Sequence, residues 1–171
     1  MKKVGIIFVI AVMFLCGCSG NMKAGKAYLN EEKYAEAKAA FEKEVQAEKH
    51  LKEAYYGLGM ACFELEEYEA AVENFEKAVL FGMKRDPVFC SFLAGSYMET
   101  ERYEAAILEY KNAIFDEDIT EELKQEARYN MIIAYEKIGD WDKAKKELKN
   151  YTKDYPDDMR IKRDADFLET R

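Results

Sequence analysis

The chain has few of the residues that carry out chemistry or interrupt helices. Its 171 residues include two prolines, four cysteines and a single histidine, His50. No histidine and cysteine set has the spacing of zinc ligands, and neither a Gly-x-Ser-x-Gly nor a Gly-x-x-x-x-Gly-Lys segment occurs. A lone histidine in a charged connection is usually a solvated residue. The sequence therefore predicts no catalytic residue, no metal site and no cofactor.

One acidic stretch, residues 116–122, superficially resembles a calcium-binding loop. Glu121 stands where such a loop needs glycine, and Ala127 stands where it needs a closing glutamate, so metal binding is not expected. The plainer interpretation is a helix start. Asp118 or Thr120 would cap the free amides, and the acidic residues that follow would favour the positive end of the helix dipole.

The chain has no surplus of basic residues. It contains 26 lysines and arginines against 34 aspartates and glutamates, for a net charge of −8. Loss of Lys2 and Lys3 would change this charge to −10. Nucleic-acid affinity depends on lysine and arginine neutralising phosphates, so a nucleic acid is an unsuitable partner. Charged residues make up 35% of the chain and prolines are few, a composition typical of one soluble domain of amphipathic helices.

The sequence also lacks an apolar run long enough to cross a bilayer. Residues 4–15 are apolar except for one glycine and follow Lys2 and Lys3. Twelve helical residues reach about 18 Å, against about 30 Å of hydrocarbon. This pattern is typical of a secretory signal peptide.

The end of this leader, Leu-Cys-Gly-Cys at residues 15–18, resembles the bacterial lipobox. The resemblance implies that residues 1–17 are removed and that Cys18 becomes a lipidated N-terminus carrying a diacylglycerol. Two or more acyl chains give stable anchoring. Cys16 departs from the small or aliphatic residue usual at its position. The alternative is an ordinary signal peptide, which the missing Ala-x-Ala site disfavours.

After the leader, a motif of glutamate, aromatic residue, alanine and second aromatic residue occurs three times, and a looser fourth copy follows. The first aromatic residues of its four copies, Tyr34, Tyr68, Tyr103 and Trp141, are separated by 34, 35 and 38 residues. Steps of three and four residues place the apolar positions of each copy on one helix face. Such a period predicts units that bury their apolar faces only against neighbouring units. In the second copy this face consists of Tyr68, Ala71, Val72, Phe75, Ala78 and Val79, and the preceding helix carries Tyr55, Leu58, Gly59 and Cys62.

Small residues recur at one position of that preceding helix. Gly59 has Gly25 and Ala94 as its counterparts in the neighbouring units. Glycine costs a helix about 1 kcal/mol relative to alanine, so we expect a close crossing between paired helices in return. Cys62 and Cys90 fall about one helix length apart, too far for a disulfide, and are interpreted as apolar fillers.

These positions closely resemble the tetratricopeptide repeat over roughly residues 22–156. The resemblance implies an all-α fold, an α-α superhelix of about four helix-turn-helix repeats. The expected parts are a tether at 18–21, units at about 22–50, 51–84, 86–118 and 120–156, and a polar-backed capping helix at 157–170. The fourth unit departs from the pattern, with Ile132 for the small residue and Leu148 for the aromatic residue.

The candidate working surface is the inner face of the first helix of each unit. Its residues are mostly apolar and suit an apolar helix or an extended segment of another protein. Chaperone adaptors of this family clamp a peptide carboxylate with lysine and asparagine, and only Asn130 matches here. Alternatively, these residues pack on the cap or on one another. The predicted groove residues are Tyr56, Met60, Phe63, Ser91, Met98, Tyr129 and Ile133, with Gly95, Lys26 and Leu29 beside them.

The favoured interpretation is an exported, membrane-anchored adaptor of the bacterial cell envelope. It would bind a protein or peptide segment while the diacylglyceryl group on Cys18 holds it to the extracytoplasmic side of the membrane. Three extended residues reach only about 10–11 Å, so Lys23 and Lys26 would face anionic lipid. The alternatives are a self-assembling structural module and an envelope enzyme or small-ligand receptor. The last would need ionisable groups within the groove.

Overall fold

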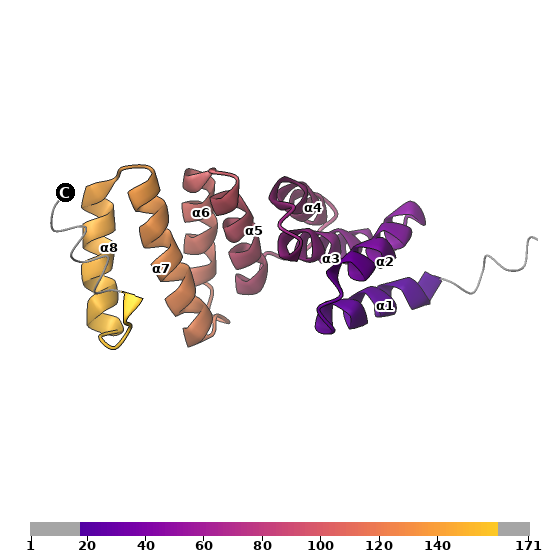
Figure 1. Ribbon diagram of the computed structural model, residues 1–171, viewed down its shortest axis with the longest axis horizontal. Helices are drawn as coiled ribbons and strands as arrows, with labels where there is room; N and C mark the ends of the chain where they lie inside the picture. The colour runs from indigo at the N-terminus through magenta and orange to yellow at the C-terminus, as the bar shows by residue number, and fades with distance from the viewer. Residues whose placement is uncertain (1–17, 161–171) are drawn as a thin grey trace, which may run out of the picture.

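The structure, a computed structural model, describes residues 18–160. The predicted leader and most of the predicted capping helix therefore lie outside the described residues. Within residues 18–160 the chain forms eight α-helices and no strand, which confirms the all-α fold (Figure 1). These are α1 (Cys18–Asn30), α2 (Tyr34–Gln46), α3 (Leu51–Glu64), α4 (Tyr68–Leu80), α5 (Pro87–Glu99), α6 (Tyr103–Ile114), α7 (Glu121–Lys137) and α8 (Trp141–Asp154).

The helices form four hairpins stacked in a row, from α1 and α2 at one end to α7 and α8 at the other (Figure 1). Each helix packs on the next one in the chain. The odd-numbered helices also contact one another, whereas the even-numbered helices of the described chain do not. The odd-numbered helices therefore lie on the inside of the curve. This arrangement is the predicted α-α superhelix.

A left-handed residue ends the first helix of every hairpin. It is Glu32, Glu66 or Glu101 in the first three units, with φ of 58°, 60° and 58°, and Gly139 with φ of 76° in the fourth. This conformation closes the last helical turn and reverses the chain. It costs a residue with a Cβ about 1–2 kcal/mol, so the first three turns are strained relative to the fourth.

Side-chain caps start two of the inner helices. Asp86 directly precedes α5, whose first residue is Pro87, and its carboxylate accepts a hydrogen bond of 2.9 Å from the Phe89 amide in the first turn. The Thr120 hydroxyl accepts one of 3.3 Å from the Leu123 amide at the start of α7. Thr120, and not Asp118, is therefore the cap of the predicted helix start.

The buried core has the same period as the sequence motif. At Gly25 and Gly59 of the inner helices, an aromatic ring of the paired helix occupies the space that a side chain would need. A Cβ at Gly25 would lie 2.7 Å from the Phe41 ring, and one at Gly59 would lie 2.6 Å from the Phe75 ring. The expected close crossings are thus confirmed, since no side chain fits at either position. The motif alanines Ala37, Ala71, Ala106 and Ala144 are all fully buried.

Two cysteines, Cys62 and Cys90, are buried and free. Burial raises the pKa of each thiol to about 11, so both are protonated at neutral pH. A protonated, buried thiol is a poor nucleophile, and both residues behave as small apolar side chains.

The N-terminal part differs from expectation at the tether. Residues 18–21, expected to be extended, form the start of α1. A helix rises 1.5 Å per residue, so three residues here span about 4.5 Å instead of 10–11 Å. The reach from Cys18 to the first repeat is therefore shorter than the sequence indicated.

The interpretation of His50 as a solvated residue is incomplete. Its ring is half exposed, but Nδ1 lies 3.1 Å from a carboxylate oxygen of Glu44, which is fully buried. The other Glu44 oxygen accepts a hydrogen bond of 3.2 Å from the Met22 amide. Glu44 stands where the next two units have Ala78 and Ala113, so this carboxylate ties α1, α2 and the start of α3 together.

Candidate functional site

Two hollows lie along the inner helices of the described chain. The larger one, the central hollow, has a volume of about 510 Å³ and lies among α3, α5 and α7. The smaller one, the N-terminal hollow, has about 330 Å³ and lies between α1 and α3. The central hollow is lined by Phe63, Tyr68, Gly95, Met98, Glu99, Glu101, Tyr103, Tyr110, Asn130, Ile133 and Lys137. The N-terminal hollow is lined by Lys26, Leu29, Asn30, Tyr34, Met60 and Glu64.

The wall of the central hollow is shaped by Gly95 on α5. A Cβ at this position would lie 3.0 Å from the edge of the Phe63 ring, so the missing side chain lets that ring lie against α5. Phe63 in turn packs edge-to-face on Phe92 at 5.2 Å and on Tyr68 at 5.6 Å between ring centroids. Interlocked rings of this kind give the hollow a preformed apolar floor.

The structure places most of the predicted groove residues in these two hollows. Phe63, Met98 and Ile133 come together in the central hollow, with Gly95 beside them. Met60 lines the N-terminal hollow, where Lys26 and Leu29 join it.

Three predicted groove residues line neither hollow. The Tyr56 ring stacks on Phe89 of α5 at 5.5 Å, and its burial raises the pKa of the phenol to about 12. The Ser91 hydroxyl donates to the Pro87 carbonyl of its own helix at 2.8 Å. Tyr129 is buried under Arg160, whose guanidinium lies 4.1 Å from the ring centroid. Tyr56 is covered because the next unit packs on it, and Tyr129 because the chain after α8 folds back over α7.

The inner face carries charged residues that the sequence interpretation missed. Glu99 and Glu101 line the central hollow together with Lys137, and Glu64 lines the N-terminal hollow. Glu64 and Glu99 directly follow Phe63 and Met98, so the inner face is one residue wider than steps of three and four indicated. The groove is therefore less apolar than expected.

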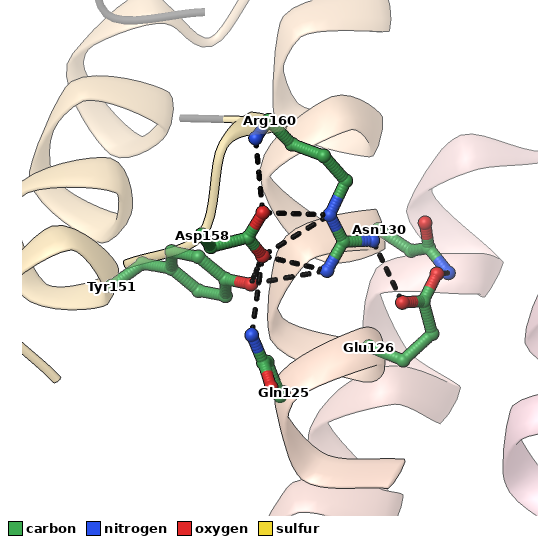
Figure 2. A network of polar contacts seen from close by, with 6 residues as sticks. All are labelled: Gln125, Glu126, Asn130, Tyr151, Asp158 and Arg160. Carbon is green, nitrogen blue, oxygen red and sulfur yellow. Dashed lines mark hydrogen bonds and ion pairs between the residues drawn. The ribbon is translucent and has the colours of Figure 1, made fainter. Parts of the chain in front are cut away.

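The far end of the row is closed by a polar network around Asp158 (Figure 2). Its carboxylate accepts hydrogen bonds from the Tyr151 hydroxyl at 2.6 Å, from the Gln125 side chain at 3.1 Å and from Arg160 Nη2 at 2.8 Å. The pKa of Asp158 is held well below its usual value, with Arg160 the largest cause, followed by the Tyr151 hydroxyl. Tyr151 belongs to α8 and Gln125 to α7, so Asp158 joins the last two helices.

Arg160 extends this network to the groove wall. Its Nη1 lies 2.8 Å from a Glu126 oxygen, and Glu126 accepts a hydrogen bond of 3.2 Å from the Asn130 side chain (Figure 2). Asn130 itself lines the central hollow. The segment after α8 thus supports one wall of the candidate site.

Residues 18–160 contain neither a cluster of metal ligands nor a helix that could span a membrane. In residues 18–160, no group of three or more His, Cys, Asp or Glu side chains is arranged to hold a metal ion. None of the eight described helices is both long and apolar enough to cross a bilayer.

Comparison with sequence families gives two matches along the chain. Two models of the tetratricopeptide repeat match residues 22–87 and residues 126–158, together more than half of the chain. The comparison with curated proteins finds no match.

Solved structures share the same fold. YrrB, described as a TPR protein with an unusual peptide-binding site, is 21% identical with a TM-score of 0.71, over 82% of this chain and 70% of that one. A MamA protein is 20% identical with a TM-score of 0.69, over 84% of this chain and 75% of that one. MamA of AMB-1 is 16% identical with a TM-score of 0.72, over 86% and 84% respectively. At these identities the likeness shows the fold.

Proposed function

Because this chain belongs to the tetratricopeptide repeat proteins, we propose that it is a membrane-anchored adaptor that binds a segment of another protein along its odd-numbered helices. The adaptor would hold that segment close to the membrane and so help to assemble or position a complex of the cell envelope. No catalytic role is proposed.

The observation that carries this proposal is the placement of the two hollows. Both touch α3, through Met60 in the N-terminal hollow and Phe63 in the central hollow, and both are lined mainly by residues of the odd-numbered helices, which lie on the inside of the curve. One extended or helical segment running along the inside can therefore reach several units. The preformed aromatic floor supports this role because little ordering is needed on binding.

The membrane part of the proposal starts from Cys18. A diacylglyceryl group on this residue would be joined directly to α1, because the helix begins there. The first repeat would then lie against the lipid headgroups on the extracytoplasmic side. Lys23 is exposed and suited to anionic lipid, whereas Lys26 also lines the N-terminal hollow, so it would face the groove as much as the membrane.

Site-specific photocrosslinking in living cells tests the adaptor role. A photoreactive residue at Met98, in the central hollow, is expected to capture one discrete protein. The matched control is Leu108 on α6, which is apolar and 57% exposed but lies outside both hollows. No capture at Met98, or the same captured bands at Leu108, would contradict the proposal.

Metabolic labelling with a radioactive fatty acid tests the anchor. Cys18→Ser is expected to abolish incorporation, whereas Cys16→Ser, two residues away, should retain it. Label retained in the Cys18 variant would rule out the anchor and leave the adaptor role to be judged by the crosslinking alone.

One observation favours self-assembly as a second candidate. Leu80 and Phe115, at the C-terminal ends of α4 and α6, are 79% and 82% exposed. Exposed apolar side chains of this size are suited to contact with another copy of the chain. Sedimentation of the purified protein would show a dimer that Leu80→Glu and Phe115→Glu dissociate. A monomer at all concentrations would exclude this candidate.

A further inference from the structure

We infer that the central hollow receives a lysine or arginine side chain of the partner, flanked by apolar residues. This inference rests on the proposed function and adds the chemistry of the segment that is bound.

The walls of the central hollow are rich in aromatic rings. Phe63, Tyr68, Tyr103 and Tyr110 line it on the sides formed by the second and third units. The faces of such rings carry partial negative charge and attract an ammonium or guanidinium group within about 6 Å. Their apolar surface also accommodates the methylene chain of a lysine or arginine.

Two exposed carboxylates, those of Glu99 and Glu101, line the same hollow. Neither Glu99 nor Glu101 forms a hydrogen bond or an ion pair through its side chain with the residues that the structure describes. Glu99 lies close enough to the rings that its charge adds to burial in raising the pKa of Tyr68 and Tyr110. A cation in the hollow would therefore meet a ring face and a carboxylate together.

Lys137 is the opposing charge in the same hollow. It belongs to α7, whereas Glu99 belongs to α5 and Glu101 to the turn that follows it. The hollow is therefore negative towards α5 and positive towards α7. This asymmetry directs the partner's cation towards α5. It disfavours an acidic segment, which would meet two carboxylates for one ammonium group.

Selection from a random-peptide library displayed on phage tests the inference, with the full chain in mild detergent as the bait. We expect the enriched peptides to carry lysine or arginine between apolar residues. Replacing that basic residue by glutamine in a synthetic peptide should weaken binding at least about fivefold, as measured by fluorescence anisotropy. Binding of the basic peptide should also weaken as salt is added.

Protein variants assign this effect to the carboxylates. The double variant Glu99→Gln with Glu101→Gln should bind the basic peptide as weakly as the wild type binds the glutamine peptide, and should no longer distinguish the two. The matched control, Glu69→Gln with Glu104→Gln, changes exposed carboxylates of α4 and α6 outside the hollow and should leave the affinity unchanged. Lys137→Gln should bind the basic peptide at least as tightly as the wild type.

The outcomes separate the two proposals. Enrichment of neutral or acidic peptides, or full binding of the basic peptide by the double carboxylate variant, would overturn the cation site while peptide binding stands. The variant Ile133→Arg, which places a competing cation in the central hollow, serves as a second bait in the same selection. If the wild-type bait enriches peptides no better than this variant does, both the groove function and the cation site are overturned.

Discussion

Replacing Asp158 with asparagine would test how the last hairpin is held together. The carboxylate is 8% exposed and accepts hydrogen bonds from Tyr151, Gln125 and Arg160. Asparagine has nearly the same shape, but it loses the charge and presents an NH₂ group to some of these donors. The variant therefore removes the electrostatic part of the network and leaves the packing intact.

The expected loss follows from the geometry. Hydrogen bonds to a charged group contribute about 1.5–3 kcal/mol when buried. The Arg160 side chain is 36% exposed, so water competes for its part of the network and reduces that contribution. We therefore expect Asp158→Asn to lower the free energy of unfolding by about 1–2 kcal/mol at pH 7.

The pH dependence has a definite direction. The pKa of Asp158 is lowered in the folded protein, whereas an unfolded aspartate titrates near 3.9. The carboxylate therefore contributes its full stability above about pH 5 and loses it as the pH falls through 4 and below. The difference between wild type and variant should shrink as the pH is lowered towards 3.

Urea unfolding followed by circular dichroism measures this difference, and hydrogen exchange of the α7 and α8 amides locates it. Repeat units open in part independently, so the loss should appear first in these two helices. Asp157→Asn, at an exposed neighbouring position, is the control and should change stability by less than about 0.5 kcal/mol. Equal stability of wild type and Asp158→Asn at pH 7, or a difference that does not change down to pH 3, would refute this account.

Three further predictions concern the repeat itself. Gly59→Ala should lower the free energy of unfolding by about 1 kcal/mol in a urea titration, because its Cβ meets a buried ring; Gly20→Ala, with nothing within 4 Å, should not destabilise, and equal effects would contradict the crossing argument. Glu66→Gly should raise the free energy of unfolding by about 0.5 kcal/mol, seen as a higher melting temperature, because relief of the left-handed conformation outweighs the extra entropy that glycine loses on folding; an unchanged or lower melting temperature would show that the turn is not strained. Cys62 and Cys90 should resist iodoacetamide at pH 8 until urea unfolds the chain, because burial raises the pKa of both thiols to about 11. Mass spectrometry measures the labelling, and rapid labelling of the native protein would contradict their burial.

The sequence by itself was sufficient to predict the superhelix. Contacts in a solenoid join residues within one unit or one unit apart, so a repeated motif encodes them locally. Gly59 against the aromatic ring of its partner helix is such a contact, and so is the fully buried Ala71. The inner position of Phe63, Met98 and Ile133 followed from the same helical steps.

Residues that depart from the repeat could be interpreted only with the tertiary structure. Glu44 replaces the alanine of the next two units, and its burial against His50 has no counterpart in the motif. Tyr129 occupies an inner position by its register, yet it is covered by Arg160, which lies beyond the last unit. Neither contact is encoded by the period.

The distribution of charge in the central hollow could also be interpreted only with the tertiary structure. Glu99, Glu101 and Lys137 lie at the ends of helices or in a turn, and each is unremarkable in its own segment. They meet because α5 and α7 pack side by side on the inside of the curve. Helical periodicity determined which faces are buried, because burial follows one helix at a time. The packing of neighbouring units determined which charged residues share a hollow. Their electrostatic interaction depends on their distance in space and not on their separation along the chain.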